Sequence, residues 1–169
     1  MRVKRESEFV VLTFNLLEAR FFDQILDRIA ATYRAKPGTL SGPTEEVLYS
    51  TKGCAAETTL EEAGEWAEHL RGFKSSRLTL IDDWSSQLKS GGALRVHLKV
   101  KTDDAPAFIG AVNDHRLIAA AEHEIGEDEM SLRDPSEMAS LPDERQGALM
   151  EIHFLAWIME EVLHALESS

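Results

Sequence analysis

Hydrophobic and polar positions follow two different periods along the chain, and these periods separate expected strands from expected helices. Residues 8–14 read EFVVLTF, a β-branched and aromatic run that is typical of a short strand. Residues 94–100 alternate between apolar and polar side chains, which indicates a strand with one face on the core. Because a lone strand leaves its backbone groups unpaired, we expect these two to pair, in the commoner antiparallel sense.

Helical spacing of apolar side chains predicts about five helices around this sheet. The first follows Asn15, which has Glu18 three residues later, the signature of a capping box, and it runs to about residue 33. Thr59 and Asp104 stand where the N-caps of two later helices are expected. Residues 60–72 and 76–89 predict either one bent helix or two. The other expected helices cover residues 44–49, 105–124 and 143–167.

The last two expected helices are apolar on most of their faces. Residues 105–121 read APAFIGAVNDHRLIAAA, in which four consecutive residues, Asn113 to Arg116, are the only strongly polar ones. Helices of this kind are normally buried, so we expect the two to lie together at the centre of a bundle. The predicted fold is mainly α: a helical bundle of about five helices with a small two-stranded β-sheet, in one domain of 169 residues.

The polar turn within the apolar helix is the most informative feature of the chain. Burying Asp and Arg costs several kcal/mol each unless they are paired and hydrogen-bonded. We therefore expect Arg116 to be largely buried and paired with Asp114, Glu160 or Glu161. A structural knot is the favoured interpretation, and a ligand or partner site and catalysis remain alternatives. The candidate cluster, structural or ligand-binding, consists of Asn113, Asp114, His115, Arg116, Trp157, Glu160 and Glu161.

Histidines of the last helix offer an alternative based on a metal ion. His153, Glu160 and His164 share one helical face, at spacings of seven and four residues, and could form a mononuclear site. Glu161 and His164 have the spacing of a di-metal bundle motif, but that chemistry needs two copies and the sequence has one. The favoured interpretation has no metal and no cofactor, and a small metal-dependent enzyme is the alternative.

Charge and cysteine content exclude several classes of protein. With 18 Lys and Arg against 30 Asp and Glu, the net charge of -12 makes nucleic acid or an anionic membrane a poor partner. Cys54 is the only cysteine, so no intrachain disulfide can form. The sequence shows neither a signal peptide nor a membrane span, and we expect a cytoplasmic protein. Residues 122–144 hold many carboxylates and one cation, Arg133, which predicts a mobile loop that steers a basic partner. Within it, we expect residues 127–141 to be more exposed than either flanking helix.

Two of these patterns together resemble a known family. The helix pattern A-x-N-D-x-R-L after an aromatic residue, and the C-terminal pattern F-L-x-W-x-x-E, are similar to an uncharacterised, mainly actinobacterial domain-of-unknown-function family. The matching residues are Phe108, Ala111, Asn113, Asp114, Arg116, Leu117, Phe154, Leu155, Trp157 and Glu160. The resemblance implies a mostly helical domain with no known activity. Members are often encoded near components of the Clp protease system, which implies at most a role around proteolysis.

These observations favour a non-catalytic function. We expect an interaction or adaptor-like domain with an unknown protein partner, no nucleic acid or membrane partner, and a possible homo-oligomeric state. No phosphate-binding loop, nucleophile elbow or zincin motif stands in the sequence, which weighs against an enzyme without deciding the question.

Overall fold

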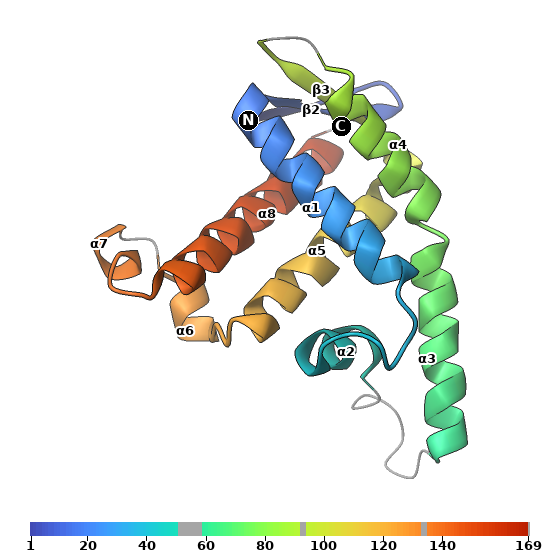
Figure 1. Ribbon diagram of the computed structural model, residues 1–169. Helices are drawn as coiled ribbons and strands as arrows, with labels where there is room; N and C mark the ends of the chain where they lie inside the picture. The colour runs from blue at the N-terminus through green and yellow to red at the C-terminus, as the bar shows by residue number, and fades with distance from the viewer. Residues whose placement is uncertain (51–58, 92–93, 133–134, 169) are drawn as a thin grey trace.

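The computed structural model describes residues 1–50, 59–91, 94–132 and 135–168, so Cys54 and Arg133 lie outside the described residues. The chain is mainly helical, as predicted (Figure 1). The long helices are α1 (Leu16–Arg34), α2 (Gly42–Tyr49), α3 (Leu60–Ser75), α4 (Leu78–Lys89), α5 (Ala105–Glu122) and α8 (Asp143–Glu167). The short ones are α6 (Glu127–Met130), α7 (Pro135–Met138) and the 3-10 turn η1 (Thr102–Asp104).

The sheet has three antiparallel strands in the order β1 (Arg2–Glu6), β2 (Phe9–Phe14) and β3 (Val96–Lys101). Antiparallel pairing of the two predicted strands is confirmed. The expectation of a two-stranded sheet is wrong, because β1 forms a hairpin with β2 through Ser7, which has a positive φ of 53°. β1 reads RVKRE, so it pairs through its backbone while its side chains, Val3 apart, are exposed.

Local sequence signals explain where α1 and α3 begin. Asn15 and Thr59 form the capping boxes of α1 and α3, which confirms both predicted caps. Asp104 makes no side-chain cap, because η1 carries the chain directly from β3 into α5. α3 and α4 are separate helices. The prediction of about five helices is too low, because α6 and α7 form in the acidic segment that we expected to be a loop.

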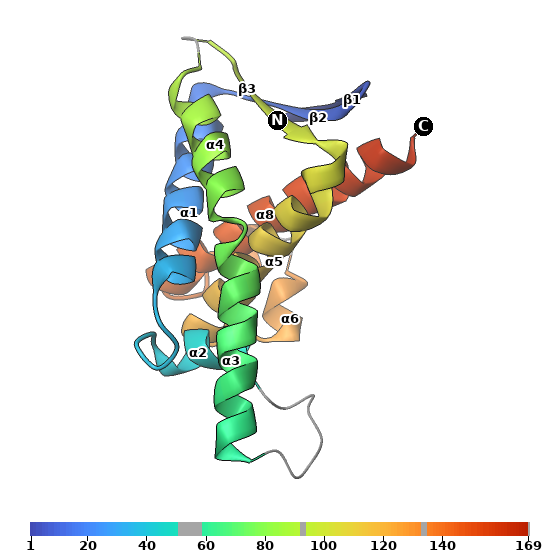
Figure 2. The same cartoon turned by 90° about the vertical axis from the view of Figure 1, so that its right-hand side faces the viewer.

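The helices pack below one face of the sheet. In both Figure 1 and Figure 2 the sheet lies across the top, with α1, α4, α5 and α8 beneath it. α5 and α8 pack against each other, as predicted, and α1 packs along α4. Phe22 is fully buried beneath the sheet and lies against the rings of Phe14, Phe108 and Phe154. A smaller apolar cluster under α6 and α7 includes Leu149 and Ile152.

None of the helices in the described ranges is both long enough and apolar enough to cross a membrane.

Candidate functional site

The polar turn of α5 does not form one cluster, because its residues point in different directions. Successive side chains on an α-helix are about 100° apart around the axis. Asp114 therefore faces α1 and α3, His115 faces α1 and α8, and Arg116 lines a separate hollow beside α8.

Asp114 forms a knot that joins three helices. Its Oδ2 atom accepts hydrogen bonds from the Tyr33 hydroxyl and from Nζ of Lys74, both at 2.6 Å. The Lys74 ammonium also lies 5.7 Å from the centre of the Tyr33 ring, and Lys74 is only 8% exposed. Burial, followed by the negative charge of Asp114, raises the pKa of the Tyr33 hydroxyl well above its ordinary value. Through these contacts Asp114 joins α1 and α3 to α5.

His115 takes part in a second polar network, which joins α1, α5 and α8. Its Nε2 atom lies 2.6 Å from Oε1 of Glu151, and Nη2 of Arg28 donates to Oε2 of Glu151, also at 2.6 Å. Burial opposes ionisation of Glu151, but the hydrogen bonds from His115 and Arg28 outweigh it and hold the pKa of this carboxyl below its ordinary value. Glu151 is therefore a carboxylate at neutral pH. Because a carboxylate only accepts hydrogen bonds, Nε2 of His115 carries a proton.

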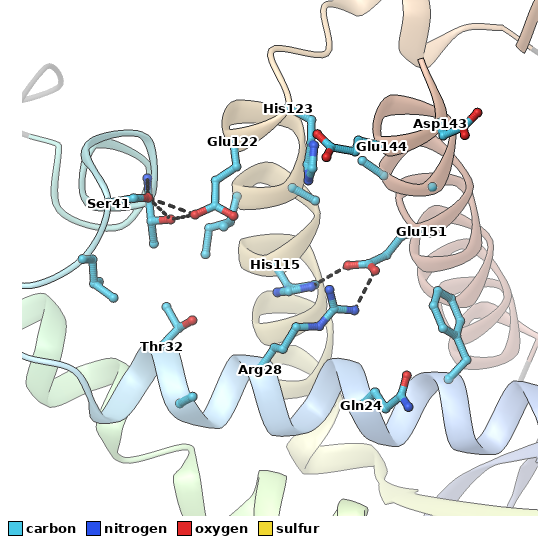
Figure 3. A pocket seen from close by; sticks show the side chains of 18 residues that line it. Gln24, Arg28, Thr32, Ser41, His115, Glu122, His123, Asp143, Glu144 and Glu151 are labelled. Carbon is cyan, nitrogen blue, oxygen red and sulfur yellow. Dashed lines mark hydrogen bonds and ion pairs between the residues drawn. The ribbon is translucent and has the colours of Figure 1, made fainter. Parts of the chain in front are cut away.

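This network lies in the wall of a cleft of about 660 Å³ that opens between α1, α2, α5 and α8 (Figure 3). Across the cleft, Ser41 and Thr44 donate to Oε1 of Glu122 at 2.9 and 2.6 Å, which holds the start of α2 against the end of α5. Asp143 and Glu144, from the first turn of α8, border the cleft on its exposed side. Clefts of several hundred Å³ are typical of ligand sites.

Most charged groups of the cleft are carboxylates, which accept hydrogen bonds, and Nδ1 of His115 is a further acceptor when the imidazole is neutral. His115 is 6% exposed, and its second ring nitrogen, Nδ1, is buried without a hydrogen-bond partner. Glu122, Asp143 and Glu144 add negative charge, and the only Lys or Arg in the described lining, Arg28, is already bound to Glu151. This arrangement favours a ligand that donates hydrogen bonds and carries positive charge.

The hydroxyl groups of the cleft are bound within the protein. Ser41 and Thr44 donate to Glu122. Neither ring nitrogen of His115 is hydrogen-bonded to a hydroxyl, because Nε2 lies against Glu151 and Nδ1 has no hydrogen-bond partner.

Comparison with known proteins identifies the family. A family model described as a domain of unknown function, DUF2017, matches residues 1–166. The chain belongs to the DUF2017 family. This match confirms the resemblance to an uncharacterised domain-of-unknown-function family. No curated protein and no solved structure matches the chain. The evidence for a function of this DUF2017 chain is therefore the geometry of its own residues.

Arg116 does not form the expected ion pair. It is half-buried and lines a hollow of about 180 Å³ that Glu160 also lines, but no carboxylate in the described ranges lies within salt-bridge distance. Its Nε atom is buried without a hydrogen-bond partner. Asp114 cannot serve because it lies two residues earlier in the helix, on roughly the opposite side, where Lys74 binds it.

The other predicted site residues are dispersed over α5 and α8. Asn113 is half-buried, and Trp157 is 38% exposed. Glu160 is exposed and Glu161 half-buried, and neither forms an ion pair in the described part of the chain. Sequence reasoning missed Glu151, although a signal was present. It is the only acidic residue among residues 147–158, so the argument applied to Asp114 applies equally to it.

The metal alternative lacks the geometry it requires. Nε2 of His153 lies 3.1 Å from the carbonyl oxygen of Met130, and His164 is exposed. Over residues 1–50, 59–91, 94–132 and 135–168, no group of three or more His, Cys, Asp or Glu side chains is placed to hold a metal ion. We therefore do not propose a site at His153, Glu160 and His164.

The acidic segment is exposed, as predicted, but it has more structure than expected. No side chain described over residues 127–132 and 136–141 is buried, whereas the flanking helices α5 and α8 contain many buried residues. Arg145 donates to the Glu124 carbonyl oxygen at 2.8 Å and to Glu129 at 2.5 Å. Met130 and Met138 pack against the small cluster beneath. The segment is therefore attached to α8 at its apolar positions and presents its carboxylates to solvent.

Proposed function

We propose that this chain is a non-catalytic, adaptor-like interaction domain, whose cleft between α1, α2, α5 and α8 binds a positively charged segment of a partner protein. The observation that carries the proposal is the combination, in one cleft of about 660 Å³, of a buried, unpartnered Nδ1 of His115 with the carboxylates of Glu122, Asp143 and Glu144. The three carboxylates accept hydrogen bonds and attract positive charge, and Nδ1 of His115 accepts a hydrogen bond when the imidazole is neutral.

The unpartnered nitrogen supports a ligand that donates hydrogen bonds. A buried polar group without a partner costs about 1–3 kcal/mol, and a donor from a ligand would recover much of that free energy. Solvent does not reach Nδ1 of His115, so the donor group has to part the side chains that cover it. On the other side of the ring, Nε2 of His115 is bound to Glu151, which Arg28 holds in place, so the orientation of the imidazole is fixed before a ligand binds. A lysine or arginine side chain has the reach and the donors for this contact.

Charge around the cleft supports a basic partner. Asp143 and Glu144 are exposed at the start of α8, and the exposed acidic segment between α5 and α8 continues the negative surface. Charges of this kind mainly raise the association rate and make it depend on salt. We place this role in the cytoplasm, and the resemblance described above extends the proposal to a role around proteolysis.

The test fills the cleft without disturbing the fold. Gly147 lines the cleft, and a Cβ atom built on it meets no heavy atom within 4 Å. The substitution Gly147→Trp therefore occupies the cleft from one side of α8. Gly64→Trp is a matched control, because Gly64 is an exposed glycine of α3 that also has no heavy atom within 4 Å of the added Cβ.

Proteins captured from the native host by the tagged wild-type chain and by both variants are compared by mass spectrometry. The affinity of each captured protein is then measured after purification. We expect a partner whose binding is lost with Gly147→Trp, kept with Gly64→Trp, and weakened by Asp143→Asn with Glu144→Gln. Partners that bind both tryptophan variants equally would show that the cleft is not the binding site.

A further inference from the structure

The outer face of the sheet gathers basic side chains from two distant parts of the sequence. The register places Arg2, Thr13 and His97 in one row across the three strands. The next row consists of Lys4, Val11 and Lys99, and the third of Glu6, Phe9 and Lys101. Because side chains alternate along a strand, all three rows lie on the same face.

This face is turned away from the helices. Val10, Leu12 and Phe14 of the central strand point into the core and are at most 1% exposed, so the three rows are on the opposite side. In Figure 2 the helices all lie on one side of the sheet. Lys4, His97, Lys99 and Lys101 are exposed. Val11 is only 3% exposed at the centre, which fits aliphatic stems of Lys4 and Lys99 folded over it from either side.

The charge of the face is opposite to that of the whole chain. Arg2, Lys4, Arg95, Lys99 and Lys101 are five of the 18 Lys and Arg residues, and Arg95 joins the face because it lines a shallow hollow with Arg2 and Thr13. Glu6 is the only acidic residue in the three rows, and it forms an ion pair with Lys4. The hydrogen bond from Lys4, with the positive charges of Lys4 and Lys99, lowers the pKa of Glu6. The charged side chains of the three rows therefore lie close enough together to influence one another.

We infer that this basic sheet face is a second interaction surface, which binds a segment of a partner protein rich in Asp and Glu. The inference is independent of the cleft, whose polar groups select the opposite charge. The net charge of -12 repels such a segment at long range, but salt screens charges beyond about 8–10 Å, so the local cations decide binding at contact. Strands of five or six residues offer a face that an extended segment of similar length covers.

The composition of the face favours an acidic peptide over a nucleic acid. Proteins that bind single-stranded nucleic acid on a sheet stack bases on exposed aromatic side chains. Phe9 is the only Phe, Tyr or Trp residue in the three rows, and its side chain is half-buried at the edge of the face. The centre of the face is occupied by Val11 and Thr13. The face thus supplies charge without a stacking platform.

Fluorescence anisotropy tests the inference with two labelled probes, a peptide of about ten glutamates and a single-stranded oligonucleotide of about ten thymidines, at about 0.1 M salt, where the screening length is about 10 Å. The variant Lys99→Glu with Lys101→Glu reverses two charges of the face. Arg20→Glu with Lys36→Glu is the matched control, because both cations are exposed and lie outside the sheet, Arg20 in α1 and Lys36 in the connection that follows it. We expect the full-length wild-type chain to bind the glutamate peptide, and the Lys99 and Lys101 variant to bind it at least about tenfold more weakly.

Folding of each variant is checked by circular dichroism. If the doubly reversed variant does not fold, Lys99→Gln with Lys101→Gln replaces it, with an expected loss of about threefold to fivefold. The control should change the dissociation constant less than about twofold. Absence of peptide binding by the wild-type chain, an equal loss in the control, or tighter binding of the oligonucleotide than of the peptide would each overturn the inference.

Discussion

Removal of the Asp114 carboxylate should destabilise the chain strongly, because it leaves two buried partners unsatisfied. Asp114→Ala removes the acceptor of the Tyr33 hydroxyl and the counter-ion of Lys74, whose side chains join α1 and α3 to α5. Breaking a buried ion pair from one side costs about 3–5 kcal/mol. Because the side chain of Asp114 is 20% exposed and that of Lys74 is 10% exposed, we expect the lower end of this range, about 3 kcal/mol.

Thermal and urea unfolding measure this loss. For a chain of this size, a change of about 3 kcal/mol lowers the melting temperature by roughly 6–12 °C. Asp82→Ala is the matched control, because Asp82 binds Arg34 at 2.8 Å while both side chains are more than half exposed. Exposed pairs contribute about 0–1 kcal/mol, so the control should change little. Lys74→Met in the Asp114→Ala background should recover part of the loss. Equal effects of the two alanine substitutions would refute the reasoning.

Three further predictions follow from the cleft and the acidic segment. Because the folded state lowers the pKa of Glu151, its ion pair stabilises the chain above the ordinary glutamate pKa of about 4.3, and this contribution is lost as the pH falls through the folded pKa. The free-energy difference between wild type and Glu151→Gln in urea titrations should therefore shrink in acid, and a difference that grows would contradict the network. Gly147→Ala should raise the melting temperature, with a gain of up to about 1 kcal/mol, because alanine favours a helix and its Cβ meets no neighbour; a lower melting temperature would show a crowded position. Glu127→Gln with Asp128→Asn should change the free energy of unfolding in urea by less than about 0.5 kcal/mol, and a clearly larger loss would mean that these exposed carboxylates support the fold.

The parts of the fold that sequence predicted are those with strong local signals. The last helix was expected over residues 143–167 and α8 covers Asp143–Glu167, because apolar residues recur at helical spacing to the end of the helix. β1 was missed because its residues are charged and show no alternation of apolar and polar side chains. Its position depends on pairing with β2, which is a tertiary contact. α6 was missed because its EDEM sequence resembles a solvated turn, and it depends on the apolar cluster beneath it.

The candidate site was predictable only in part, because its partners are distant in the sequence. His115 was named in the candidate cluster because it is a polar residue inside an apolar helix, and in the structure it is buried beside Glu151. Arg28 and Glu151 are 123 residues apart, and no local pattern links them. The basic sheet face was hidden for the same reason, since Lys4 and Lys99 become neighbours only through the register of β2.

Hydrogen exchange with a captured partner bound tests the central claim that the cleft is the binding site. The first turn of a helix has backbone N–H groups without partners inside the helix, so a ligand that covers it slows their exchange. The account predicts slower exchange in residues 41–45 of α2 and residues 143–148 of α8, which border the cleft on two sides. Slower exchange confined to other segments, with these two unchanged, would contradict the account.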